Sequence, residues 1–466
     1  MLLNINVGTL VMQRLLMFKI ITIFLLILLL LIPLNMIRHL ITERMTLRNG
    51  VVAEIARSSA VSQTILGPIL VVPYNYIEKN ESNVISQKEG NLYFLPETFK
   101  LNGKLEVEKR KRGIYEARVY NLTHNQLTGY FNIPPNFGIT ASKLIHYQFG
   151  QPFIAVGIKD IRGLNNPLEF TVDGTKLDII PGTGILNQKL KSGIHVSLDK
   201  TSLLPGGSFS YQIAMQLIGT SSLNIVPIGK QTTVTLQSNW PHPSFEGSFL
   251  PSSRNVSKQG FTATWQTNFF ATNMEDELMY CLSRSCCSCS NINTLGVSLI
   301  NPVDQYLKSD RAIKYSLLFI GLTFFGFFIF EMVKRLAIHP IQYSFVGIAL
   351  ALFFLLLLSL SEHIGFNLAY FCSAASCIGL ISFYMMGILA NKKQSIIFGI
   401  ALLALYGMLY VLLNGEDYSL LLGSILVFGV LAIAMIATRK LNWYQITTFT
   451  PVNLSKEKAT KESRYE

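Results

Sequence analysis

Long runs of apolar residues occupy the two ends of the chain, and alternating apolar and polar residues fill much of the region between them. The first run is Ile20–Leu34, with Arg14 and Lys19 before it and Arg38 after it. With its margins it approaches the roughly 20 residues that a helix needs to cross a bilayer core. No small-x-small cleavage site follows, which favours an uncleaved anchor over a signal peptide.

Five further apolar segments, each long enough to span a bilayer, lie towards the C-terminus. They are Ile313–Phe330, Tyr343–Leu360, Phe366–Ala390, Ile396–Leu413 and Ser419–Ala437. The residues that follow them alternate between basic and non-basic: Lys334 and Arg335, Glu362 and His363, Lys392 and Lys393, Glu416 and Asp417, Arg439 and Lys440. Short loops rich in Lys and Arg stay in the cytoplasm. We therefore expect six spans, with both termini cytoplasmic and the long segment before Ile313 in the periplasm.

The start of that long segment continues the helical pattern. Apolar residues recur at roughly helical spacing after Arg38. We expect this helix to continue to Gly67-Pro68, and we expect Ile69–Val72 to form a buried strand.

Beyond residue 100 the apolar period changes to two, which is typical of strands with one buried face. The clearest stretch has apolar residues at Phe209, Tyr211, Ile213, Met215 and Leu217. Several short strands separated by Gly, Pro and Asn favour an antiparallel β sandwich or barrel. The predicted fold is a multi-pass α-helical membrane protein with six spans and a large periplasmic antiparallel β-rich domain. Its parts are 1–37 (cytoplasmic N-terminus and first span), 38–312 (periplasmic domain), 313–437 (five-helix bundle) and 438–466 (cytoplasmic tail).

The composition agrees with a chain of which one part lies in lipid and another in water. Only 14% of the 466 residues are charged, against roughly 25% in soluble domains. The net charge of +12 would suit a nucleic-acid partner, but much of it belongs to the basic linkers and the tail. We therefore expect membrane lipids, and no nucleic acid, as partners of those residues. Trp443 and Tyr444 suit an interfacial anchor.

No motif in the sequence indicates an enzyme. The seven histidines form no HExxH pair, and the nucleophile-elbow, phosphate-loop and dinucleotide fingerprints are missing. We therefore predict no catalytic residue, no cofactor and no bound metal. Lys109–Arg112 could bind a phosphate or a lipid headgroup, but its place between two alternating runs and before Gly113 favours a solvated hairpin.

Two short segments are candidates for contact with a ligand or partner. Trp240 and His242 belong to an aromatic and proline-rich stretch that is either a binding corner or a rigid turn packed under a sheet. Glu362 and His363 follow a predicted span on its outer side, as a solvated loop end or as a polar pair at the membrane surface.

The six cysteines fall into two groups. Cys281, Cys286, Cys287 and Cys289 crowd one short stretch. Thiolates suit copper(I) and zinc, but the spacing lacks the paired CxxC of a zinc site. An oxidising compartment favours disulfides, within the cluster or with another chain, so we expect disulfides or unpaired surface thiols in place of a metal site. Cys372 and Cys377 lie inside a predicted span, where we expect them to be packing residues.

Short stretches distributed along nearly the whole chain carry a resemblance to a known family. They are Ser62–Pro68 running into Val72-Pro73-Tyr74, Asp160–Leu164, Trp240–Phe245, Pro302–Tyr306, His339–Tyr343 and Ser361–Phe366. In this order, with this architecture, the chain resembles the CreD family of bacterial inner-membrane proteins. The resemblance implies a Gram-negative inner-membrane protein linked to envelope stress, tolerance of E-type colicins and a β-lactam-related regulon. It implies no catalytic mechanism, and the cysteine cluster is not part of the family pattern.

Two hypotheses about function follow. In the first, a non-enzymatic protein maintains or signals cell-envelope integrity through a periplasmic domain that contacts an envelope protein or lipid. In the second, the five-helix bundle transports a substrate or handles lipid past Glu362 and His363.

Overall fold

The computed structural model describes residues 3–79, 85–139, 147–185, 191–199, 205–283, 292–301, 304–334, 338–389, 392–415 and 419–439. The chain divides into two compact units. The helical unit contains residues 1–46 and 303–466, and the β unit contains residues 47–302. Helix α1 (Leu3–Ser58) contributes residues to both.

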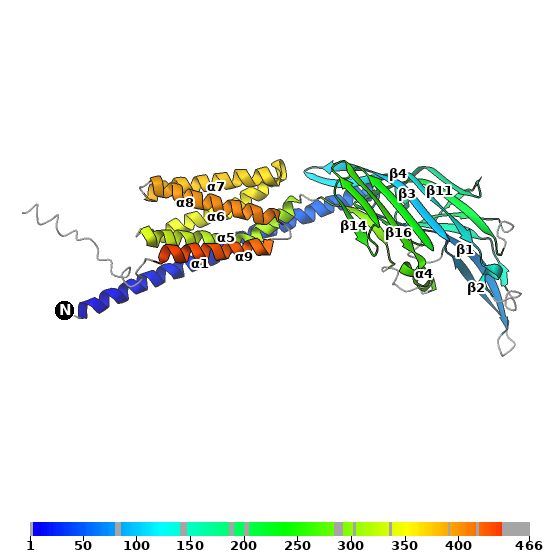
Figure 1. Cartoon of the computed structure of the whole chain (residues 1–466), viewed down its shortest axis with the longest axis horizontal. Helices are drawn as coiled ribbons and strands as arrows, with labels where there is room; N and C mark the ends of the chain where they lie inside the picture. The colour runs from blue at the N-terminus through cyan, green and yellow to red at the C-terminus, as the bar shows by residue number, and fades with distance from the viewer. Residues whose placement is uncertain are drawn as a thin grey trace, which may run out of the picture. The chain divides into compact units, whose positions relative to one another are not determined.

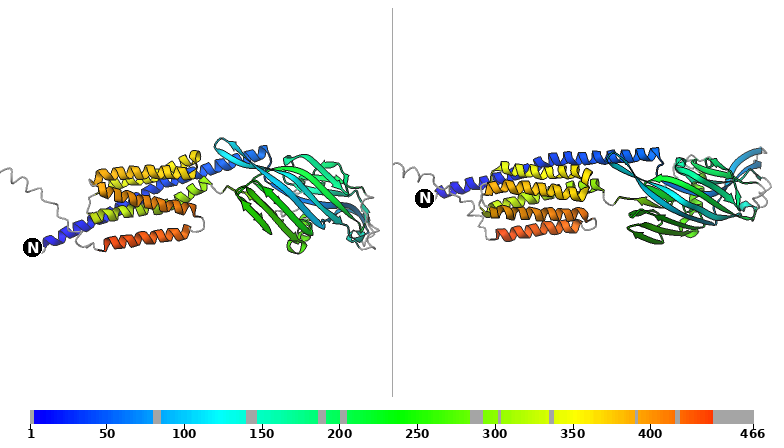
Figure 2. Two further views of the ribbon diagram at one scale, coloured as in Figure 1. Left: turned by 45° about the horizontal axis from the view of Figure 1, so that its top comes forward. Right: turned by 90° about the horizontal axis from the view of Figure 1, so that it is seen from above.

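In the part of the chain that the structure describes, the helical unit contains the first part of α1 and five helices that lie side by side (Figures 1 and 2). These are α5 (Gln305–Lys334), α6 (Pro340–Ile364), α7 (Phe366–Leu389), α8 (Lys392–Asn414) and α9 (Ser419–Thr438). Among the described residues, five helices are long and apolar enough to cross a membrane, namely α1 and α5 to α8. The predicted sixth segment is also helical, but its surveyed apolar stretch, Leu421–Ile436, is shorter.

Helix α6 shows why these segments are suited to lipid. Its inner face is buried at positions four residues apart, such as Val346, Leu350 and Phe354. Its outer face is apolar too, with Ile348 and Leu352 about half exposed. A helix that is apolar on every side is typical of a membrane span, because lipid replaces water as its solvent.

The described strands of the β unit form two sheets (Figure 1). The nine-stranded sheet has the order β14-β17-β12-β1-β6-β10-β9, with β2 and β5 also paired to β1. Its strands are β1 (Gln63–Lys79), β2 (Ile85–Phe94), β5 (Tyr147–Phe149), β6 (Phe153–Ile158), β9 (Ile179–Pro181), β10 (Gly193–Ser197), β12 (Ser222–Ile225), β14 (Pro243–Gly247) and β17 (Leu295–Leu299). The eight-stranded sheet has the order β15-β16-β13-β3-β4-β11-β7-β8. Its strands are β3 (Thr98–Arg112), β4 (Tyr115–Asn132), β7 (Leu164–Val172), β8 (Thr175–Lys176), β11 (Ser208–Thr220), β13 (Gln231–Ser238), β15 (Ser253–Ser257) and β16 (Gly260–Asn268).

Short helices accompany the strands: η1 (Pro135–Gly138), η2 (Ile161–Gly163), α3 (Phe269–Thr272) and α4 (Met274–Ser283). The sheets are mixed, which corrects the expectation of a purely antiparallel domain. Strand β12 pairs with β1 in parallel, and β13 pairs with β3 in parallel. In both cases more than a hundred residues separate the partners in sequence, so no hairpin turn dictates an antiparallel pairing.

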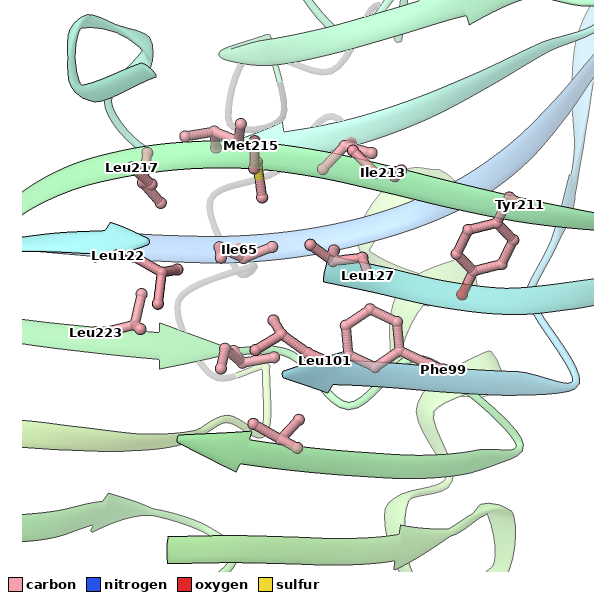
Figure 3. Close-up of a cluster of buried hydrophobic side chains, with 14 of the residues drawn as sticks. Ile65, Phe99, Leu101, Leu122, Leu127, Tyr211, Ile213, Met215, Leu217 and Leu223 are labelled. Carbon is pink, nitrogen blue, oxygen red and sulfur yellow. The ribbon is translucent and has the colours of Figure 1, made fainter. Parts of the chain in front are cut away.

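The core of the β unit lies between the two sheets. Ile65 and Leu223 from the nine-stranded sheet and Leu101, Leu122 and Met215 from the eight-stranded sheet belong to one buried cluster (Figure 3). The alternation predicted for β11 is confirmed, since its apolar residues are buried at every second position. Burial of these side chains stabilises the unit by removing apolar surface from water.

The predicted end of the first helix is wrong. Helix α1 ends at Ser58, and Gly67-Pro68 interrupts the pairing of β1 with β6 as a bulge inside β1. Gly67 has a φ of +121°, and a Cβ there would lie 2.9 Å from the carbonyl oxygen of Ala155. Only glycine fits this close approach, so the pair marks a bulge and not a helix end. Ile69–Val72 forms the predicted buried strand segment.

Candidate functional site

One polar network lies at the end of the helical unit that carries the predicted pair Glu362 and His363. The Glu362 side chain is only 10% exposed. It accepts a hydrogen bond of 3.0 Å from the Tyr306 hydroxyl on α5, and the Nε of Arg44 on α1 lies 3.7 Å from its Oε1. Asp304 caps the start of α5 by accepting from the Tyr306 amide. The network therefore connects α1, α5 and α6, while His363 is exposed.

A second network, at the opposite end of α5, was not predicted from the sequence. Glu331 is 3% exposed. It forms an ion pair with Lys19 of α1, and it accepts hydrogen bonds from the Tyr343 hydroxyl at 2.7 Å and from the Ile338 amide at 3.1 Å. His339 caps α6 next to this network. The only sequence signal was a carboxylate at the end of an apolar run, close to Lys334.

These two networks position helices, because every described carboxylate in them already has a partner. A buried charge is costly unless it is paired and hydrogen-bonded. Glu331 and Glu362 meet that condition with residues from the same three helices. The pairs consequently hold α1 against α5 and α6 at both ends, without leaving a free acid or base.

A third polar cluster connects the two sheets of the β unit. The Gln63 amide is buried and donates to the carbonyl oxygens of Asp160 and Ile218, both at 2.9 Å. Its oxygen accepts from the Asp160 amide at 3.1 Å. The Asp160 carboxylate accepts a hydrogen bond from the Val61 amide at 3.1 Å. It also accepts two from the Arg162 guanidinium, from Nε at 2.9 Å and from Nη2 at 2.7 Å.

The electrostatics of Asp160 follow from these contacts. Hydrogen bonding from the Arg162 side chain is the largest effect and lowers the pKa of the Asp160 carboxyl, while burial opposes it. Arg162 also donates to the carbonyl oxygen of Arg57, in the last turn of α1. This cluster fixes the point where α1 passes into β1.

Trp240 is the buried member of the predicted pair Trp240 and His242. Its indole is 9% exposed, belongs to the core between the sheets, and donates to the carbonyl oxygens of His242 and Ile300. The Lys109 ammonium lies 5.7 Å from the ring centroid. These contacts favour the interpretation of Trp240 as part of a rigid turn, whereas His242 is exposed on the surface.

The basic run Lys109–Arg112 forms the end of β3, and the hairpin turn lies at Gly113-Ile114. Arg112 pairs with Glu54 at 2.6 Å, and Lys109 lies 3.5 Å from Glu116. The predicted hairpin is confirmed, and acidic neighbours accompany its basic side chains.

A shallow cavity of about 370 Å³ surrounds His242. It lies between β14, at the edge of one sheet, and β15, at the edge of the other. Apolar side chains around it are unusually exposed: Leu250 by 70%, Val256 by 48% and Ile300 by 43%. Arg254 adds a positive charge. We call this region, with His242, the edge surface.

The cysteine cluster falls mostly outside the described residues. Cys281 lies in the last turns of α4, while Cys286, Cys287 and Cys289 are not described. Within the described ranges, no group of three His, Cys, Asp or Glu side chains could hold a metal ion. In the helical unit, Cys377 is buried and accepts a hydrogen bond from the Tyr406 hydroxyl, while Cys372 is exposed.

Comparison with known proteins agrees with this architecture. A model of the family described as Inner membrane protein CreD matches residues 15–444. The chain belongs to this family. It is 38% identical to Inner membrane protein CreD of Escherichia coli (strain K12) over 449 residues, which is 94% of each chain. Family membership and five long apolar helices support a multi-pass location in the inner membrane.

Stretches that carried the resemblance to the CreD family meet in space. Ser62–Pro68 supplies Gln63, which bonds to Asp160 of the stretch Asp160–Leu164. Tyr306 likewise bonds to Glu362 across two other stretches. The family description and the name of the Escherichia coli relative both give an inner-membrane location, and neither names a catalytic activity.

Proposed function

We propose that this CreD-family protein is a non-enzymatic component of the inner membrane that maintains or signals cell-envelope integrity. In this proposal the β unit faces the periplasm and contacts an envelope polypeptide through the edge surface. The observation that carries the proposal is the group of exposed apolar residues at the edges of both sheets, around His242.

The proposed topology has six spans, counting α9, with both termini in the cytoplasm. It is supported by the alternation of basic and non-basic linkers, because Lys and Arg in short loops orient spans towards the cytoplasm. Residues 38–312 would then lie in the periplasm. A membrane-impermeant thiol reagent applied to intact spheroplasts should label the Cys281–Cys289 cluster if its thiols are reduced, and a cysteine introduced at exposed Lys176 in either case. Protection of the Lys176→Cys position would contradict the topology.

Chemistry at the edge surface favours an extended polypeptide as the partner. Among the described strands, β14 and β15 lie at the ends of the strand orders of their sheets, so each offers one side to which no further described strand is paired. An extended segment can add to such an edge through main-chain hydrogen bonds. Leu250 and Val256 offer apolar contacts beside it, and Arg254 with His242 favours an acidic side chain.

The test is a pair of substitutions in the chromosomal gene, each of which replaces an exposed apolar residue by lysine. Val256→Lys places a charge in the edge surface, and Ile180→Lys places one on β9, at the far edge of the same unit, where Ile180 is 42% exposed. The readouts are colicin tolerance, detergent sensitivity and outer-membrane permeability. Only Val256→Lys should reproduce the deletion phenotype at normal protein abundance. Equal behaviour of the two variants would refute the edge surface, and a deletion without phenotype would refute the envelope role.

The second candidate function, transport or lipid handling by the bundle, depends on Glu362 and His363. The observation that favours it is a mostly buried carboxylate at one end of the bundle, Glu362, which lies 3.7 Å from the guanidinium of Arg44. Glu362→Ala and His363→Ala without phenotype, in a strain where the intact gene matters, would argue against it.

A further inference from the structure

An open groove of about 660 Å³ runs between α1 and α5 in the helical unit. This volume falls within the roughly 300–1,000 Å³ of small-molecule sites. Its walls at one end are apolar side chains, including Leu31 and Ile32 of α1 and Leu317 of α5. Arg38 and His39 of α1 and Lys314 of α5 lie at the other end.

The groove exists because α1 packs along a single narrow seam. Leu30, Leu34, Ile37 and Ile41, at helical spacing, are 6% exposed or less. Leu30 fits against Gly347 of α6, where a Cβ would lie only 2.5 Å from a Leu30 methyl group. The seam draws α1 towards α6, and the apolar side chains flanking it on α1 remain open, with Ile32 exposed by 63%.

The two helices run in opposite directions, so their polar residues coincide at one end of the groove. Arg38 follows the apolar residues of α1, whereas Lys314 precedes those of α5. Lys314 pairs with Asp310 at 2.7 Å, and its side chain is still 57% exposed. Arg38 and His39 are exposed as well. The basic end therefore combines the positive charges of Arg38 and Lys314 and the imidazole of His39 with the acid Asp310.

We propose that this groove binds a phospholipid with an anionic headgroup. Its acyl chains would lie along Leu31, Ile32 and Leu317, and its phosphate would contact Arg38 and Lys314. An arginine guanidinium matches phosphate oxygens through paired hydrogen bonds, and a lysine adds a compact charge. The apolar length of the groove selects a lipid over free phosphate, and the excess of positive charge selects an anionic headgroup over a zwitterionic one.

Native mass spectrometry of the purified full-length protein tests this proposal, with phosphatidylglycerol, phosphatidylethanolamine and glycerol phosphate as probes. The native chain should retain phosphatidylglycerol preferentially and glycerol phosphate hardly at all. Arg38→Gln with Lys314→Gln should weaken phosphatidylglycerol binding about tenfold, since a basic residue near an anionic headgroup contributes roughly a factor of five and Lys314 is partly neutralised. Ile32→Trp should reduce retention of both lipids by filling the groove.

A matched control removes the same charge from the same helices outside the groove. Arg48→Gln with Lys308→Gln should leave phosphatidylglycerol retention unchanged. Equal losses in the two double variants would overturn the proposal, as would equal retention of phosphatidylethanolamine and phosphatidylglycerol. Binding of glycerol phosphate as tightly as phosphatidylglycerol would also overturn it, because the apolar part of the groove would then contribute nothing.

Discussion

Replacing Gln63 by alanine should destabilise the β unit more than any exposed substitution in it. The side chain is 0% exposed, and its amide makes three hydrogen bonds to main-chain groups. Two of these groups belong to Asp160, which follows β6, and the third to Ile218 on β11 of the other sheet. The substitution therefore removes a direct hydrogen-bonded connection between the two sheets.

The expected cost follows from the groups left without partners. Each buried main-chain group that loses its hydrogen bond costs about 1–3 kcal/mol, and the emptied volume adds a cavity term. Partial relaxation and access of water reduce the sum, so we expect about 4 kcal/mol for Gln63→Ala. For a unit of this size, about 4 kcal/mol corresponds to a fall in melting temperature of roughly 8–16 °C.

Intrinsic tryptophan fluorescence of the full-length protein in detergent provides the assay. Trp240 and Trp265 are both buried in the core of the β unit and report its unfolding. Gln63→Met keeps much of the volume and should lower the melting temperature less than Gln63→Ala. Gln212 on β11 is exposed, so Gln212→Ala is the matched control and should change stability by less than about 0.5 kcal/mol. A shift for Gln63→Ala no larger than that of Gln212→Ala would show that the hydrogen bonds of Gln63 do not stabilise the β unit.

Two further predictions concern the charged groups Asp160 and Glu331. The pKa of Asp160 is lowered by Arg162, so its stabilising contribution is present above the pKa of about 3.9 of an unfolded aspartate and is lost as the pH falls through the folded value. The melting-temperature difference between the native chain and Asp160→Asn should therefore be largest near neutral pH and shrink below about pH 4; a difference independent of pH would contradict this. Glu331→Ala breaks the buried pair with Lys19 and should destabilise the helical unit by about 3 kcal/mol, more than Glu331→Gln. Thiol reactivity of buried Cys377 on heating, with the other cysteines replaced by serine, measures the loss, and equal reactivity in both variants would contradict the pairing.

Periodic patterns in the sequence predicted the elements well where a single face is buried. The alternation from Phe209 to Leu217 predicted the strand β11 and its buried face. Successive side chains of a strand point to opposite faces of the sheet, so apolar residues at every second position lie on the same face. Uniformly apolar runs likewise predicted the helices of the helical unit, five of which, among the described residues, are long and apolar enough to cross a membrane. These signals are local and need no knowledge of partners.

Long-range pairing could not be predicted in the same way. The sequence of Gly67-Pro68 predicts a helix end, because it does not reveal that the Ala155 carbonyl approaches Gly67. The parallel pairing of β3 with β13 depends on the whole sheet, and no turn sequence encodes it.

In the candidate site, too, the sequence indicates individual residues but not the partners that they contact across helices. Glu362 was singled out by its place after a span, but its partners Arg44 and Tyr306 come from two other helices. Glu331 was missed altogether, because a single acid at the end of an apolar run resembles an ordinary linker residue. Only the packing of α1 beside α5 identifies Lys19 as its partner.

The proposed envelope role depends on contact between the edge surface of the β unit and an envelope polypeptide. Photo-crosslinking in living cells tests it most directly, with the photoreactive residue at Val256 and, as a control, at Ile180. We predict one specific polypeptide adduct from position 256 that is lost when Leu250→Asp is added, and no such adduct from position 180. The same adducts from both positions, or lipid adducts alone from position 256, would contradict the claim.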